Sequence, residues 1–234
     1  MLKTLGTLEV RSLGLMPYRE ALALQESLVR ARAASEIGDT LLLLEHPPVL
    51  TAGRASHPDS LRADAATLAR HGLELVPVTR GGDVTWHGPG QLVGYPICEL
   101  TAQARDLHSF LRRLERAIQS TLARWNIDAR PNPGRTGVWV GERKIASIGI
   151  AVRQWVSYHG VALNVRPSLE HFDLIHPCGL RGVRMTSMAE RLGAGCPRMD
   201  AVRDALADEL AAALGYDDLK WSGRPRVTAS LAGV

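Results

Sequence analysis

The sequence predicts an α+β fold in which helices pack against a mixed or antiparallel sheet. Three segments carry apolar residues at helical spacing, shorter apolar runs rich in β-branched residues lie between them, and turn residues join neighbouring runs into hairpins. Strands gathered into hairpins, with a few helices between them, are typical of this class. With 234 residues, 45% of them hydrophobic, the chain can bury a full core, and no long linker divides it. We therefore expect one domain over residues 1–234.

The three predicted helices cover residues 18–34, 107–125 and the segment that ends at Gly215. The third helix is expected to start at Asp200 as its cap, and Gly215 is a typical stop signal. In the second helix one face is apolar, and we expect it to be core: Leu107, Phe110, Leu111, Leu114, Ile118, Leu122 and Trp125.

Strand-like runs fill much of the remaining sequence. The runs cover residues 40–46, 73–79, 91–100, 136–141, 144–153 and 158–165. Residues 136–141 and 144–153 predict a hairpin that turns at residues 141–143, and residues 158–165 predict a further strand.

Composition limits the classes of protein that fit. No apolar run approaches the roughly 18 residues of a membrane span, and charged and polar residues interrupt the N-terminal apolar run, unlike a signal peptide. Three cysteines without framework spacing indicate reduced thiols and a cytoplasmic protein. The net charge of +4 suits a protein that binds nucleic acid or acidic partners, and equally one with neither.

Lysine is rare in this chain. Of the 28 basic residues only Lys3, Lys144 and Lys220 are lysines, so arginine serves wherever a positive charge is enough. Lys144 opens an apolar strand, and its amine could point into a site while its stem lies on buried surface. A solvated lysine in a turn is the alternative interpretation.

Glycines crowd the segment RGGDVTWHGPG, residues 80–90. At this density the backbone can approach a ligand closely and offer its amides as donors, although a simple turn is equally compatible. The spacing matches neither the dinucleotide fingerprint nor a phosphate-binding P-loop.

Histidine and cysteine side chains are the candidates for metal binding and catalysis. His159 and Asn164 lie on one predicted strand, where a structural histidine is the commoner case. His171, His176 and Cys178 lack the second ligand cluster of a zinc site, so no metal is expected. Cys98 is expected in the core and Cys196 in a loop, whereas Cys178 lies between Pro177 and Gly179, in a predicted surface turn.

Four ordered motifs, RGGDVTWHGPGQL, KIASIG, HGVALN and PCGL, resemble those of the lipoyl(octanoyl) transferases and cover about residues 42–190. The resemblance implies the catalytic fold shared with biotin and lipoate protein ligases. It also implies that Cys178 carries the acyl group, that Lys144 lowers the pKa of its thiol, and that three segments bind substrate: Arg80, Gly81, Gly82, Asp83, Val84, Thr85, Trp86 and His87; Ser147, Ile148 and Gly149; Gly160, Val161 and Ala162.

The implied reaction moves an octanoyl group from octanoyl-acyl carrier protein to a lysine of a lipoyl domain, in an E2 subunit of a 2-oxoacid dehydrogenase or in the glycine cleavage H protein. Free cysteine is mostly protonated at neutral pH, and a neighbouring cation favours its thiolate. Lysine could also shuttle protons, which arginine cannot do. Moving the octanoyl group from one thioester to another and then to an amide needs no ATP, so no cofactor is expected.

Three alternative functions are also compatible with the sequence. An ATP-dependent lipoate or biotin protein ligase would need no nucleophilic cysteine. A basic nucleic-acid-binding module would show steep salt dependence, but the arginines are scattered and no aromatic and basic platform is evident. A papain-like Cys-His hydrolase could use His159 or His176, although its local signature is missing.

Overall fold

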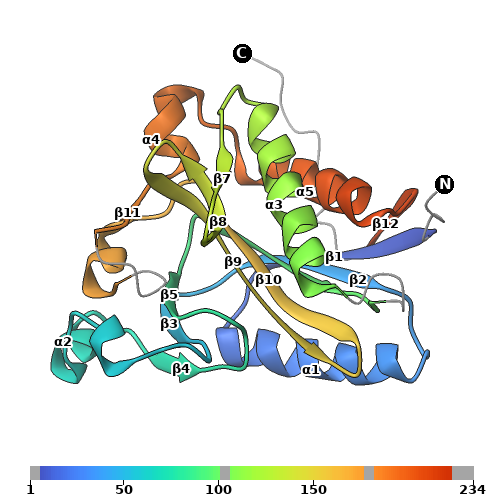
Figure 1. The fold of residues 1–234 in the computed structure, drawn as a ribbon, viewed down its shortest axis with the longest axis horizontal. Helices are drawn as coiled ribbons and strands as arrows, with labels where there is room; N and C mark the ends of the chain where they lie inside the picture. The colour runs from blue at the N-terminus through green and yellow to red at the C-terminus, as the bar shows by residue number, and fades with distance from the viewer. Residues whose placement is uncertain (1–5, 101–105, 177–181, 223–234) are drawn as a thin grey trace, which may run out of the picture.

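The fold is described here for residues 6–100, 106–176 and 182–222 of a computed structural model (Figure 1). A large mixed sheet forms its centre, in the strand order β12-β1-β2-β6-β10-β9-β8-β7, and β11 pairs with β9. Its strands are β1 (Thr7–Leu15), β2 (Thr40–Glu45), β6 (Gln91–Ile97), β7 (Arg130–Asn132), β8 (Arg135–Val140), β9 (Arg143–Arg153), β10 (Val156–Asn164), β11 (Arg184–Met185) and β12 (Asp218–Ser222).

Parallel and antiparallel pairs occur together in this sheet. Strand β1 runs parallel to both β2 and β12, whereas β2, β6, β10, β9 and β8 are antiparallel to their neighbours in that order. The β8–β9 hairpin pairs Val140 with Arg143, which confirms the predicted turn. The prediction of an α+β fold with a mixed sheet is therefore confirmed.

Helices cover both faces of the sheet (Figure 1). Helix α1 (Tyr18–Ala33) packs on one face against β6 and β10, and α3 (Leu107–Ala123) packs with α5 (Met199–Leu214) on the other. Strand β2 shows the consequence, because its run of leucines alternates between the two sides: Leu41 and Leu43 join the core under α3 and α5, while Leu42 and Leu44 join the core under α1. Continuous apolar strands are typical of sheets that are buried on both faces.

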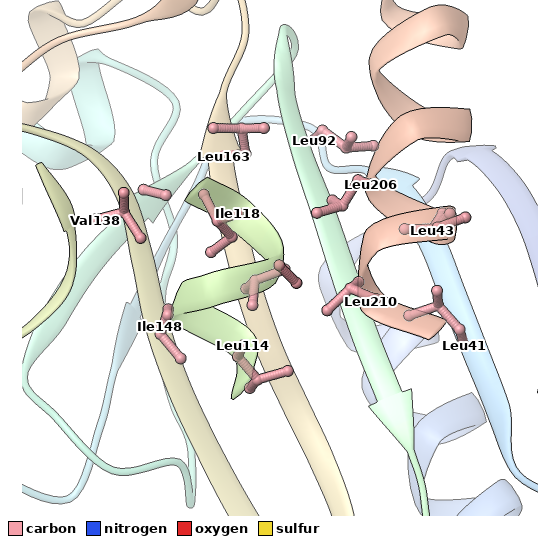
Figure 2. Close-up of a cluster of buried hydrophobic side chains, with 14 of the residues drawn as sticks. Leu41, Leu43, Leu92, Leu114, Ile118, Val138, Ile148, Leu163, Leu206 and Leu210 are labelled. Atoms are coloured by element: carbon pink, nitrogen blue, oxygen red, sulfur yellow. The ribbon is translucent and has the colours of Figure 1, made fainter. Parts of the chain in front are cut away.

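The larger core lies between the sheet and the α3–α5 pair (Figure 2). Leu114 and Ile118 of α3 lie near Ile148 and Val138 of the sheet, and Leu210 of α5 lies near β6. The predicted apolar face of α3 is largely correct, but Leu107 is 42% exposed because it begins the first turn.

A second, three-stranded sheet has the order β4-β3-β5, formed by β4 (Leu75–Pro77), β3 (Val49–Ala52) and β5 (Val84–His87). It packs with α2 (Ala65–Arg70) and the 3-10 helix Glu170–Leu174 around a smaller core. The 3-10 turns Pro58–Ser60 and Gly193–Gly195 and the short helix α4 (Met188–Leu192) complete the described elements.

The predicted start of the third helix is wrong. Helix α5 begins at Met199 with Arg198 at its cap, so Asp200 lies inside the first turn, where its carboxylate accepts from the amide of Ala201 at 2.9 Å. The positive end of the helix dipole stabilises a carboxylate in the first turn, so Asp200 is favoured there as it would be at a cap. Gly215 ends the helix in the left-handed conformation, as predicted.

Within the described ranges, every helix is too short or too polar to cross a membrane.

Candidate active site

Strands β5, β9 and β10 meet around a cavity of about 40 Å³. Most of the residues predicted to bind substrate line it, although they come from three separate segments of the sequence. They are Arg80, Gly82, Asp83, Thr85, His87, Ser147, Ile148, Gly149, Gly160, Val161 and Ala162. The structure also adds Tyr18, Tyr95 and His159, which lay outside the predicted substrate-binding set.

Three residues of the predicted set do not line this cavity. Along β5 the side chains alternate, so Thr85 and His87 face the cavity while Val84 and Trp86 pack into the smaller core. Gly81 is exposed, and its amide donates to the carbonyl of Ile150 at 2.9 Å. The resemblance implied that all of residues 80–87 bind substrate, whereas the second half of this segment is the buried strand β5, whose residues face two sides.

The guanidinium of Arg80 is held by the protein backbone. It donates to the carbonyls of Thr51 and Asp83 at 2.8 and 2.7 Å and to the hydroxyl of Thr51 at 2.8 Å. Charge-assisted bonds of this kind are strong and fix a side chain's orientation. Arg80 therefore braces the segment that precedes β5 against β3.

Two cavity glycines permit close packing of the strands. Gly149 and Gly160 are direct partners in the β9–β10 ladder. A Cβ on Gly160 would lie 2.2 Å from the carbonyl oxygen of Gly94, and one on Gly149 would lie 3.0 Å from Cδ of Arg80. Any larger residue at position 160 would push β10 away from β6, so these glycines set the width of the site.

Buried imidazoles and phenols form one wall of the site, and His46, which does not line the cavity, packs against Tyr18 and His87 of that wall. Burial lowers the pKa of His46 to about 4 and that of His159 to about 3, and it lowers the pKa of His87 well below its usual value. Burial also raises the pKa of Tyr18 to about 12. The wall is therefore made of neutral polar groups at pH 7.

Lys144 is buried, with 1% of its surface exposed, so the alternative of a solvated lysine is wrong. Its Nζ lies 5.6 Å from the centre of the Trp139 ring. Gly137, at φ +119°, faces the lysine so closely that a Cβ there would lie 2.5 Å from Cε and 3.2 Å from Nζ. Strand β8 therefore supplies an aromatic ring and a side-chain-free position that together accommodate the lysine.

Strand β11 pairs directly with β9, the strand that carries Lys144. Met185 pairs with Lys144, and the amide of Thr186 donates to the carbonyl of Lys144 at 2.9 Å. A second cavity, of about 990 Å³, is lined by His176, Gly182, Arg143 and Met185 among others. Cys178 lies outside the described residues, and the described residues on either side of its segment in the sequence, His176 and Gly182, both line this second cavity.

The other cysteines are placed as predicted. Cys98 is buried, and desolvation raises the pKa of its thiol above the usual range. Cys196 is half-buried in a loop. Among the residues that the structure describes, no three His, Cys, Asp or Glu side chains are grouped as metal ligands.

Comparison with known proteins identifies the family. Residues 17–211 match the model of the lipoyl protein ligase A/B catalytic domain. An octanoyltransferase of Myxococcus xanthus is 46% identical over 210 residues, covering 87% of this chain and 58% of the relative, so the chain spans less than two thirds of that protein. Octanoyltransferases of Syntrophotalea carbinolica and Solibacter usitatus are 47% and 51% identical, over 80% and 77% of this chain and 85% and 81% of their own lengths.

Solved structures agree on the fold. A putative lipoate protein ligase from Thermoplasma acidophilum with bound lipoic acid has a TM-score of 0.70 at 19% identity, covering 93% of this chain and 89% of its own. A lipoate-protein ligase A bound with ATP has a TM-score of 0.69 at 18% identity, covering 94% and 90%. At such identities the likeness extends to the fold alone. The matches over most of the sequence establish that the chain belongs to the lipoyl protein ligase A/B catalytic family and, within it, to the octanoyltransferases, which are acyltransferases.

Proposed function

We propose that this enzyme transfers an octanoyl group from octanoyl-acyl carrier protein to a specific lysine of a lipoyl domain, through a thioester on Cys178. The observation that carries the proposal is Lys144, a rare lysine that is buried in a site built around it. Burying an ammonium group is unfavourable unless its surroundings offset the cost, so such a residue is more often functional than structural.

The pairing of β11 with β9 supports a Cys178–Lys144 pair. The segment that carries Cys178 is attached to His176 at one end and to Gly182 at the other, and β11 follows at once beside Lys144. Cys178 and Lys144 are 34 positions apart in sequence, but only a short stretch of chain separates Cys178 from β11, the strand that pairs with Lys144. We infer that Lys144 acts on the Cys178 thiol.

In the first half of the reaction, the Cys178 thiolate attacks the carbonyl carbon of the donor thioester. The new carbon–sulfur bond forms as the bond to the carrier's sulfur breaks, and the carrier leaves as a thiolate that takes a proton from the Lys144 ammonium. The positive charge near Cys178 favours the thiolate that starts this step.

In the second half, the neutral amine of the acceptor lysine attacks the octanoyl-enzyme. The amide bond forms, the bond to Cys178 breaks, and Lys144 takes up the proton that the amine loses. Each half moves the acyl group once, from the carrier's sulfur to Cys178 and then from Cys178 to the acceptor amine, so neither half consumes ATP. Each tetrahedral intermediate needs hydrogen-bond donors at its oxyanion, and backbone amides of the glycine-rich segments are our candidates.

The cavity between β5, β9 and β10 is our candidate for one end of the acyl chain, because its volume of about 40 Å³ is smaller than an eight-carbon chain. Ile148, Val161 and Ala162 give it apolar surface, and Gly149 and Gly160 set its width. The lipoyl domains of 2-oxoacid dehydrogenase E2 subunits and of the glycine cleavage H protein are the acceptors we propose. The cytoplasmic location and a single catalytic domain over residues 1–234 stay predictions.

Intact-protein mass spectrometry after mixing with octanoyl-acyl carrier protein, without ATP, tests the proposal. We expect one octanoyl increment, removable by hydroxylamine, in the wild type and in the matched control Cys196→Ala, and no increment in Cys178→Ala. An increment that persists in Cys178→Ala would refute the assignment of the nucleophile. Transfer that requires ATP and survives Cys178→Ala would instead indicate a ligase.

A further inference from the structure

A chain of buried polar side chains joins the small cavity to the strand beside Lys144, and the mechanism proposed above does not use it. It runs through Thr51 of β3, His87 of β5, Gln91 of β6 and Asn164 of β10 to the backbone of Thr186, just after β11. All five residues are buried. The chain crosses four strands from both sheets, whose arrangement Figure 1 shows.

Backbone carbonyls fix the direction of every amide in this chain, because a carbonyl can only accept. The carbonyl of Thr186 lies 3.0 Å from the amide end of Asn164, which must therefore be the nitrogen Nδ2. Asn164 then presents Oδ1 to Gln91, whose Nε2 donates to it at 2.9 Å. The carbonyl of Trp86 independently requires the same orientation of Gln91, which donates to it at 3.3 Å.

The orientation of Gln91 decides the tautomer of His87. Its Oε1 can only accept, and it lies 2.7 Å from Nδ1 of His87, so Nδ1 carries the proton. Burial keeps this imidazole neutral by lowering its pKa. Nε2 is then an acceptor, and the hydroxyl of Thr51, which itself accepts from Arg80, donates to it at 3.4 Å.

Every bond in the chain thus donates in one direction, from Arg80 through Thr51, His87, Gln91 and Asn164 to the carbonyl of Thr186. Hydrogen bonds aligned in this way strengthen one another in a low-dielectric interior. The amide of Thr186, in turn, donates to the carbonyl of Lys144. The peptide groups on either side of Thr186 are therefore held by Asn164 and by the lysine's own strand.

We propose that Gln91 and Asn164 are positioning residues for the acyl transfer: they fix His87 as the Nδ1–H tautomer at the cavity wall and, through Thr186, hold β11 in register beside Lys144. The role in transfer rests on the proposed function, whereas the tautomer of His87 does not. Nε2 of His87 then accepts from Thr51 and holds the ring at the cavity wall, and a displaced Thr186 would move β11, which follows the segment that carries Cys178.

Nitrogen-15 NMR of labelled histidine tests the first part, with the His87 signals assigned by their loss in His87→Gln. We expect the neutral Nδ1–H tautomer at pH 7 in the wild type and in Asn164→Asp, whose carboxylate can still accept from Gln91. In Gln91→Leu the preference for Nδ1–H should be lost. An Nε2–H tautomer or an imidazolium in the folded wild type would overturn the proposal.

Steady-state transfer kinetics test the second part. Asn164→Asp and Gln91→Leu should lower kcat by about 10- to 100-fold, as expected for a small misplacement of reacting groups, with KM changed by less than about 3-fold. The matched control is Ser157→Ala, on the same strand, because Ser157 is equally buried and donates to the carbonyl of Pro96 at 2.7 Å but lies outside the chain. If Asn164→Asp keeps the kcat of Ser157→Ala, β11 is not positioned by Asn164.

The two hypotheses fail in different ways. If the wild type forms no octanoyl adduct on Cys178, the proposed function fails while the tautomer of His87 still confirms or refutes the chain. If the adduct forms normally and the tautomer is wrong, only the positioning proposal fails. Thermal melts of each variant separate a loss of folded enzyme from a loss of turnover.

Discussion

Gly137→Ala should disable the enzyme by displacing Lys144. Gly137 has φ +119°, and an added Cβ would lie 2.5 Å from Cε of Lys144 and 2.6 Å from the carbonyl oxygen of Ala146. Backbone strain at such a position is worth about 1–3 kcal/mol and overpacking a further 1–3 kcal/mol, so the free energy of unfolding should fall by about 2–6 kcal/mol. The amine must also move, and we expect kcat to fall by about 100-fold.

Gly141→Ala is the matched control, because Gly141 lies in the same hairpin at φ +58° but an added Cβ there meets no described atom within 4 Å. Its cost is backbone strain alone, about 1 kcal/mol, with activity retained. Urea denaturation and transfer assays on both variants measure the difference. Equal stability losses, or full activity in Gly137→Ala, would refute the close packing of Gly137 against the lysine.

Three further predictions concern titration and reactivity. Lys144→Arg keeps a positive charge but cannot release a proton, so transfer should fall by about 100-fold or more; full activity would show that no proton moves through this residue. Burial lowers the pKa of His46 to about 4 and that of His159 to about 3, so the unfolded chain binds these protons first as pH falls below about 6.5. Urea denaturation should therefore show stability falling between pH 6.5 and 4, by about 2 kcal/mol per histidine at pH 5, and a flat profile would contradict their neutral burial. Finally, Cys98 should resist iodoacetamide in the native protein, because burial keeps its thiol protonated; peptide mapping that finds it alkylated before unfolding would exclude this packing.

The sequence predicted the elements whose periodicity is long and regular. Helices α1 and α3 and strands β2, β6, β9 and β10 were found because their apolar pattern is set by burial on one or both faces. Strand β1 was not predicted, because Glu9, Arg11 and Ser12 interrupt its apolar run in the sequence, although its burial alternates along residues 8–13. Strand β5 has no strand signature in the sequence, because glycines dominate the residues around it.

For the site, the scarcity of lysine made Lys144 a candidate, and its burial supports that interpretation. The alternation that turns Val84 and Trp86 away from the cavity could not be predicted without knowing that β5 is a strand. Nor could the contribution of Tyr18 and Tyr95, because each enters the cavity from an element whose own pattern only indicates core packing. The chain through Gln91 and Asn164 depends on strands brought together by the fold, and no local pattern indicates it.

The most direct test of the central claim is the pH dependence of Cys178 alkylation in the wild type and in Lys144→Met. A lysine cation beside the thiol should place the midpoint of the rate profile below the ordinary cysteine value of about 8.5, and removing that cation should move it upward. Lys220→Met, which removes a lysine from β12 at the far edge of the sheet, should leave the profile unchanged. Identical midpoints in the wild type and Lys144→Met would contradict the Cys178–Lys144 pair.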